Sequence, residues 1–138
     1  MSEKSAISQG QAFSSEEQWL RVEDPGEVTR LAVLSKAFHD AISVSAEWRG
    51  GDEIDDQGNL IFGTEGSQLL LRLESQFKSV PAIELWMKGV TRFVYDGRLD
   101  FDFTLDFLPD GLRLNVLAWT IECSTLWYRP LPGSSEQV

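Results

Sequence analysis

The chain has 138 residues, of which 42% are hydrophobic and 25% charged, and its formal net charge is −10. This length predicts one domain, and eight Phe, five Trp and two Tyr are enough to fill its core. The excess of acidic side chains argues against generic nucleic-acid binding, which needs cations to neutralise phosphates.

Residues 1–13 are polar and are expected to form a tail. They contain no apolar segment of the kind that signal peptides carry, and no stretch of the chain approaches the roughly 18 apolar residues of a membrane span. We therefore expect a cytoplasmic protein with no membrane contact. The acidic balance suits solubility, and it would also speed association with a basic partner.

Two helices are predicted near the N-terminus. Two serines and two glutamates over 14–17 precede Trp19 and Leu20, which favours a short helix, because serine caps a helix start and acids suit its first turn. Asp24 followed by Pro-Gly-Glu matches the start of a second helix with a capping box. The spacing of the apolar residues that follow extends this helix over 25–36.

From residue 41 onward the apolar period changes to two, which predicts strands. They are expected over 41–48, 60–62, 68–75, 82–95, 99–108 and 112–128, with a bend at Gly89 in the fourth and near Trp119 or Thr120 in the last. Residues 130–138 are expected to be a second tail. Short turns make neighbouring strands antiparallel. The predicted fold is therefore α+β, with two N-terminal helices packed on a mostly antiparallel, meandering sheet of about six strands.

The segment 99–108, LDFDFTLDFL, has the clearest alternation in the chain. Its apolar residues share one face, and Asp100, Asp102 and Asp106 share the other. Two interpretations of these acids stay open: they discourage edge-to-edge aggregation, or they form a patch that docks onto a basic protein. In the second case Glu84 and Asp96 would extend the patch from neighbouring elements.

Aromatic residues supply further candidate contacts with a partner. Trp86 shares a predicted face with Glu84 and would be an interface residue where it is exposed. Trp127 and Tyr128 have the composition of a binding anchor, although an edge that covers the core has the same composition. The strand residues Trp48 and Trp119 are predicted as core or cross-strand pairs.

Catalytic and metal-binding patterns are weak. His39, the only histidine, precedes Asp40, and a histidine beside an aspartate could act as a general base. The chain has no GxSxG motif, however, to supply the nucleophile of a hydrolase. At a helix-to-strand junction we expect the pair to have a structural or pocket role. An acidic run over 52–56 does not have the spacing of a calcium loop and predicts a solvated hairpin. We expect no enzyme activity, no metal and no cofactor. The single cysteine, Cys123, excludes an intramolecular disulfide.

The phrase AFHDAISVSAEW, followed by an acidic turn, a leucine-rich strand and IELWMKGVTRF, resembles small bacterial proteins of poorly defined function that carry an F-H-D-A motif. Some of these are regarded as immunity proteins of polymorphic toxin systems. The resemblance covers residues 37–95. It implies a small cytosolic α+β protein that neutralises a toxin by binding it, with no chemistry of its own.

The function predicted from the sequence is therefore non-enzymatic binding of a basic protein through an acidic sheet face and exposed aromatic residues. Two alternatives stay open. One is a homo-oligomeric structural or accessory domain whose sheets pair edge to edge. The other is a small-ligand-binding domain with a pocket between helices and sheet that involves His39.

Overall fold

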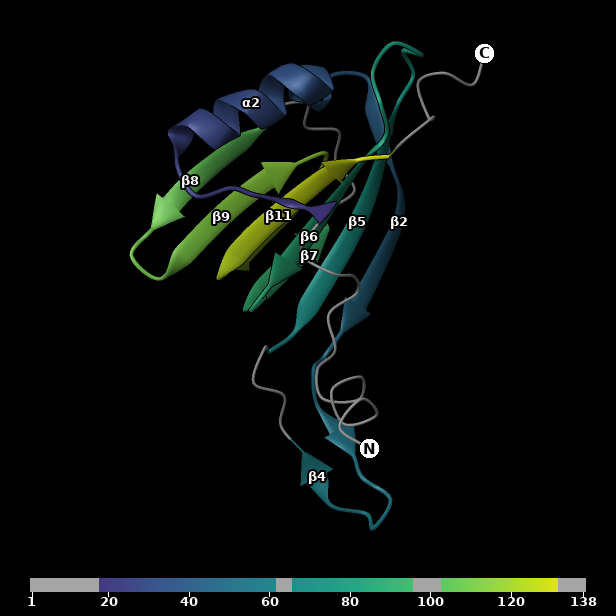
Figure 1. Ribbon diagram of the computed structural model, residues 1–138, viewed down its shortest axis with the longest axis vertical. Coiled ribbons are helices and arrows are strands. Elements are labelled where there is room, and N and C mark those ends of the chain that lie inside the picture. The colour runs from purple at the N-terminus through teal and green to yellow at the C-terminus, as the bar shows by residue number, and fades with distance from the viewer. Residues whose placement is uncertain (1–17, 62–65, 96–102, 132–138) are drawn as a thin grey trace.

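The computed structural model describes residues 18–61, 66–95 and 103–131 (Figure 1). Over these residues it contains one α-helix, a short 3₁₀ turn and strands. The helix is α2 (Pro25–Ser35), and the 3₁₀ turn is η2 (Lys36–Phe38). The strands are β1 (Leu20–Arg21), β2 (Ala41–Arg49), β3 (Glu53–Ile54), β4 (Leu60–Ile61), β5 (Gln68–Ser75), β6 (Ile83–Lys88), β7 (Arg92–Tyr95), β8 (Thr104–Leu108), β9 (Gly111–Val116), β10 (Trp119–Cys123) and β11 (Thr125–Pro130).

The strands form two main antiparallel sheets. The large sheet has the order β1-β11-β6-β5-β2, and the small sheet has the order β7-β10-β9-β8. β3 and β4 form a separate two-stranded ribbon. The expected single sheet of about six strands under two helices is therefore wrong, because the described chain has one short α-helix and divides its strands between two sheets.

The first predicted helix is replaced by a strand over the residues that the structure describes. Leu20 pairs with Tyr128 and Arg21 with Trp127, so that β1 becomes an edge of the large sheet. Capping and helix propensity favour a helix of this length only marginally. Strand pairing and the burial of Trp19 therefore decide its structure. The proposed cap over 14–17 lies outside the described residues.

The second predicted helix is confirmed. The Oδ1 atom of Asp24 accepts a hydrogen bond of 3.0 Å from the backbone N–H of Glu27, which caps α2 as the sequence indicates. The helix ends at Lys36, which adopts a left-handed conformation. α2 lies beside β8 (Figure 1), and its Leu31 is completely buried in the core. It is not long and apolar enough to span a membrane.

Predicted strands over 41–48, 60–62 and 68–75 agree with β2, β4 and β5, but the segment 112–128 is not a single bent strand. It forms β9, β10 and β11, and a two-residue turn at Leu117–Ala118 reverses the chain between the first two. Both turn residues have positive φ, of 46° and 74°. Such a turn normally contains Asn or Gly. Without these residues the sequence gives no hairpin signal here.

A corner joins the two sheets. β6 and β11 pair in the large sheet, and their continuations β7 and β10 pair in the small one. The break lies at Gly89, as the sequence predicts, where φ is 65°. The N–H of Ser124 donates to the carbonyl oxygens of Lys88 at 2.9 Å and of Gly89 at 3.2 Å. This irregular step turns both strands from one sheet into the other.

One hydrophobic core lies between the sheets and α2. The predicted alternation over 99–108 holds over 103–106, where Phe103 and Leu105 pack against the core while Thr104 and Asp106 are exposed. Phe107, which was expected on the apolar face, is 43% exposed near the end of β8. The core draws on both sheets and the helix, with Leu31, Leu71, Leu85, Leu114, Ile121 and Leu126 among its fully buried members.

Candidate functional site

Four aromatic side chains lie where the two sheets meet at the edge strands β2 and β7. We call this set, Trp48, Phe93, Tyr95 and Trp119, the aromatic opening. Residues directly opposite each other in an antiparallel pair share a face of the sheet. Trp48 is opposite the core residue Leu69, and Phe93 is opposite the core residue Ile121. Trp48 and Phe93 therefore lie on the core-facing sides of their sheets.

These residues are nevertheless accessible to solvent. Trp48 is 54% exposed, Phe93 40% and Tyr95 56%. α2 lies on the β8 side of the small sheet, whereas β7 and β2 each have one free edge among the described strands (Figure 1). The core-facing side chains at these two edges therefore reach solvent, although they lie on the same faces of the sheets as the buried core residues.

The rings of the opening contact one another in series. The ring centroids of Trp48 and Phe93 are 6.2 Å apart, which bridges the two sheets. Phe93 lies 6.4 Å from Trp119, and Trp119 lies 5.0 Å from Tyr95. These tilted contacts fix the rings relative to one another. The opening is therefore a preformed aromatic surface that crosses from one sheet to the other.

A groove of about 330 Å³ runs beside Trp48 and Phe93. Its other lining residues are Ser67, Val90, Thr91 and Arg92. The Ser67 hydroxyl donates a hydrogen bond to the Val90 carbonyl, so it already has a partner within the protein. The Arg92 guanidinium lies 3.9 Å from the Glu122 carboxylate. The groove is thus lined by apolar side chains, two hydroxyl residues and Arg92, which pairs with Glu122. Such a lining suits binding rather than proton transfer.

The edges of β2 and β7 that no described strand pairs with add backbone donors and acceptors to the opening. An edge strand can pair with an incoming extended segment through its main chain. β2 has an irregularity between Ser43 and Ser45, and such bulges obstruct pairing. Residues 45–49, which include Trp48, keep a regular register with β5. This half of the edge is therefore the part that can accept a strand.

The acidic residues predicted as a patch are not brought together over the described part of the chain. Asp106 is exposed on β8, opposite Arg113 of the small sheet. Glu84 lies on the outer face of the large sheet, where its carboxylate is 2.8 Å from the Arg129 guanidinium. Asp96, Asp100 and Asp102 lie outside the described residues. Glu84 thus belongs to a local ion pair on the large sheet, whereas Asp106 lies on β8 of the small sheet.

Trp86 and Tyr128 are fully buried, so they could contact a partner only if the covering residues moved. The Trp86 ring lies 5.1 Å from that of Trp19, and its Nε1 donates to the Gln68 side chain at 2.9 Å. Tyr128 lies in the core, and burial raises the pKa of its hydroxyl. Trp127 is partly exposed, with the Arg21 guanidinium 5.6 Å from its ring.

His39 and Asp40 form the turn that joins α2 to β2. The N–H of His39 donates to the Lys36 carbonyl at 3.0 Å, and the Asp40 carbonyl accepts from the Gln76 N–H at 3.1 Å. Asp40 and the three residues of η2 all have positive φ. The chain therefore makes a tight turn of mostly left-handed backbone at this junction. The structural or pocket role expected for His39 and Asp40 stays a prediction. Among the described residues, no group of three or more His, Cys, Asp or Glu could hold a metal ion.

The sequence did not identify the opening. Trp48 was predicted as a core or cross-strand residue, and Phe93 and Tyr95 as part of one long strand. A signal was available in the RFVY run, which places large apolar side chains on both faces of a strand just after the break at Gly89. Alternation alone does not say whether the core-facing side of an edge strand is covered.

Comparison with known proteins found no matching family, no similar curated protein and no similar solved structure. The opening is therefore interpreted from its own geometry.

Proposed function

We propose that this chain is a non-enzymatic protein-binding domain whose contact surface is the aromatic opening. The observation that supports this most directly is the exposure of Trp48, Phe93 and Tyr95 on the core-facing sides of two adjacent edges. Tryptophan and tyrosine are the residues most enriched among those that dominate binding energy at interfaces. Contiguous exposed apolar surface on a small domain commonly marks an interaction site.

The apolar surface is large enough to contribute substantially to affinity. Covering the exposed half of the Trp48 side chain would remove roughly 130 Å² of mostly apolar surface from water, which corresponds to about 3 kcal/mol. Tyr95 would add a comparable area. Because the rings already contact one another, little side-chain entropy would be lost on binding.

The net charge of the chain indicates the charge that a partner should carry. At −10, the chain would attract a basic protein and repel an acidic one, which affects association rate and partner choice more than affinity. The toxin-neutralising role that the sequence resemblance implies is one case of such binding. The resembling region, 37–95, contains three of the four residues of the opening.

Self-association through the edge of β2 is the second candidate. Ile42 and Val44 are exposed on this nine-residue edge strand, and exposed apolar edges favour strand pairing between copies. The bulge beside Val44 and the repulsion between two chains of −10 both oppose this pairing. We therefore place it second.

The experiment that tests the proposal is quantitative affinity purification from a lysate of the source organism with matched variants. Trp48→Ser with Tyr95→Ser removes the two most exposed rings, and Val33→Ser with Phe107→Ser removes exposed apolar residues elsewhere. We expect one stoichiometric partner with the wild type and the second variant, and at least tenfold less of it with the first. Equal recovery by all three would refute the proposal. Recovery of only the chain itself would favour self-association.

A further inference from the structure

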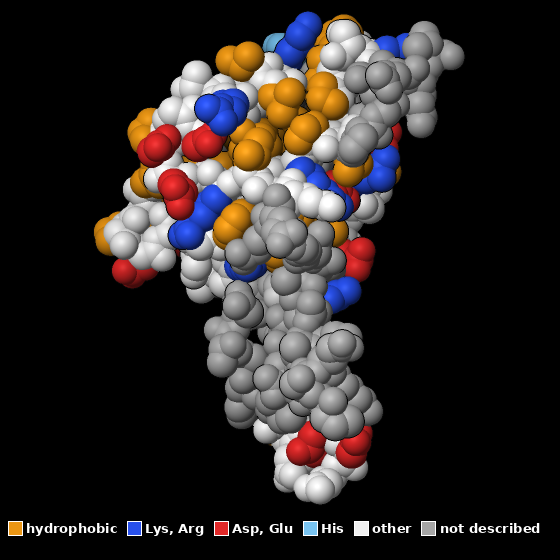
Figure 2. Space-filling model, in the orientation of Figure 1, with side chains coloured by type: hydrophobic (Ala, Val, Ile, Leu, Met, Phe, Trp, Pro, Cys, Tyr) orange, Lys and Arg blue, Asp and Glu red, His pale blue; other side chains and the backbone are white. Residues whose placement is uncertain are grey.

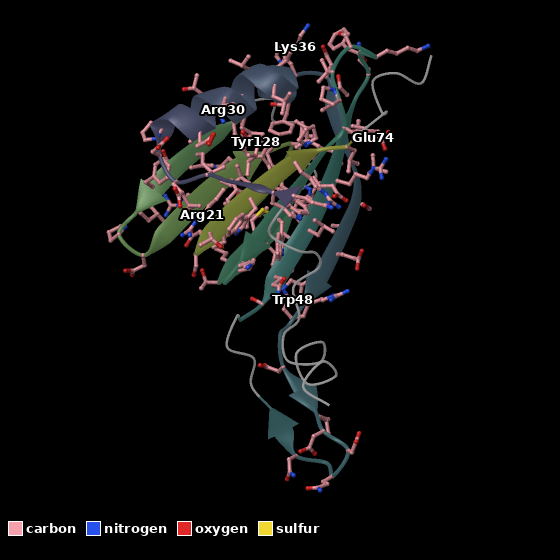
Figure 3. All side chains as sticks on the ribbon, viewed as in Figure 1. Arg21, Arg30, Lys36, Trp48, Glu74 and Tyr128 are labelled. Atoms are coloured by element: carbon pink, nitrogen blue, oxygen red, sulfur yellow. The ribbon has the colours of Figure 1, made fainter. Side chains whose placement is uncertain are left out.

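The ribbon of β3 and β4 stands away from the body of the protein. We call it the arm. It extends beyond the ends of β2 and β5, and its tip lies far from both sheets (Figure 1, Figure 2). Figure 3 places Trp48 at the end of β2 nearest the arm. The junction is set by Gly51, whose φ is 85° and whose missing Cβ would collide with the Gly66 carbonyl oxygen. The chain can adopt this geometry only with glycine there.

The arm presents a pair of apolar side chains to solvent. Ile54 and Leu60 are directly opposite each other in the ribbon, and they are 66% and 68% exposed. Over the described residues, two residue pairs hold the ribbon together. A ribbon this short gains little from its own burial. These two aliphatic residues therefore contribute little to folding in this position, whereas they would contribute to a complex in which a partner covers them.

Hydrogen bonds order the tip of the arm. The Oδ1 atom of Asp55 accepts from the backbone N–H groups of Gln57 at 2.9 Å and Asn59 at 2.8 Å. The N–H of Asp55 donates to the Asn59 carbonyl at 2.9 Å, which closes the turn. These bonds favour the charged carboxylate and lower the pKa of Asp55. A preformed tip loses less entropy when it binds.

The charge of the arm indicates what would cover it. Residues 50–61 include four acidic residues and no Lys or Arg, which gives −4 of the total −10. The acids are at positions 52, 53, 55 and 56. Figure 2 shows acidic side chains at the tip of the arm. A second copy of the chain would bring two segments of −4 together, so a basic surface is the complementary partner.

We propose that the arm docks onto a partner protein, with Ile54 and Leu60 on a recessed apolar patch that arginine and lysine side chains surround. The inference rests on the proposed protein-binding function and extends it to a second contact surface. The aliphatic pair supplies the desolvated centre of the contact, and the acids supply its charged rim. The projecting shape of the arm suits a recessed site.

A titration followed by NMR tests the inference with a probe of defined chemistry. The probe is a short synthetic peptide of alternating leucine and arginine, added to the isotopically labelled full chain at low and high salt. We expect backbone shifts to concentrate at 52–60 and binding to weaken at high salt. The variant Ile54→Ser with Leu60→Ser keeps every charge and should bind about tenfold more weakly. The control Val33→Ser removes a residue that is 73% exposed on α2 and should bind as the wild type does.

Four results would overturn the inference. Equal binding by the Ile54→Ser/Leu60→Ser variant would show charge attraction without docking. Shifts confined to β8 or to the aromatic opening would place the contact elsewhere. Sedimentation showing a dimer that this variant abolishes would make the occupant a second copy. If the lysate partner needs Trp48 and Tyr95 but not Ile54 and Leu60, the proposed function stands and the arm inference fails.

Discussion

Replacing Gly89 with alanine tests whether the corner between the sheets is as specific as its geometry indicates. At a φ of 65° an alanine costs about 1–2 kcal/mol relative to glycine. Its Cβ would also meet the side chain of Ser124, with the Ser124 Cβ only 2.8 Å away and the hydroxyl closer still. Such an overlap typically costs a further 1–3 kcal/mol. Alanine also restricts the unfolded chain, which offsets about 0.4–1 kcal/mol. We expect a net loss of about 2–4 kcal/mol.

Urea unfolding followed by tryptophan fluorescence measures this loss, since the chain has five tryptophans. With a slope of about 2 kcal/mol per molar urea, the midpoint should fall by about 1–2 M without a change in slope. Adding Ser124→Gly to the variant removes the overlap but leaves the strained φ. The double-mutant cycle should therefore show a favourable coupling of about 1–2 kcal/mol. A midpoint shift below about 0.5 M, with no coupling to Ser124, would refute this account of the corner.

Two further predictions concern the turn and the buried thiol. Ala118→Gly should stabilise the protein by about 0.5–1 kcal/mol, because Ala118 adopts a φ of 74° in a turn that favours glycine; an unchanged or lower thermal midpoint would contradict this. Burial raises the pKa of Cys123 from 9.0 to about 12. Above pH 9.0 the unfolded chain loses this proton while the folded chain keeps it, so stability should fall as pH rises, by at most about 1.4 kcal/mol per pH unit. The raised pKa of Tyr128 acts in the same direction. Urea midpoints at about pH 8 and about pH 10.5 should fall less for Cys123→Ala, and an equal fall in both proteins would exclude the thiol as a cause.

The arm and the aromatic opening give the molecule two different kinds of contact surface. The opening is aromatic, lies between the sheets and includes backbone edges that can pair. The arm is acidic, projects from the body and has an aliphatic centre. Trp48 is the next-to-last residue of β2, close to where the arm begins, so a partner large enough to cover both would contact them as one continuous surface (Figure 3).

Local patterns in the sequence predicted the elements whose structure is decided locally. The cap at Asp24 and the spacing that follows it determine α2, and an approximate period of two predicts β2 and β5. The break at Gly89 was also visible, since glycine within a strand pattern marks a bend or bulge. The solvated hairpin over the acidic run follows from turn-forming residues, and it became the arm.

Other features depend on partners that are distant in the sequence. Leu20 and Arg21 form a strand because they pair with the edge of β11 at residues 127–128. The local sequence around residue 20 contains no information about that distant partner. The turn at Leu117–Ala118 is imposed by the pairing of β9 with β10, against the preference of both residues. Pairing over many residues outweighs the local cost of two positive φ values.

Composition and apolar period are properties of the chain alone, so they already indicate that this protein is acidic, rich in strands and able to fill one core. Which aromatic residues reach solvent depends instead on how the two sheets pack. Trp86 and Trp48 both follow a strand pattern, yet Trp19 covers the first and no described strand continues the sheet beyond the second. Burial depends on what packs against a face, and alternation specifies only that the face exists.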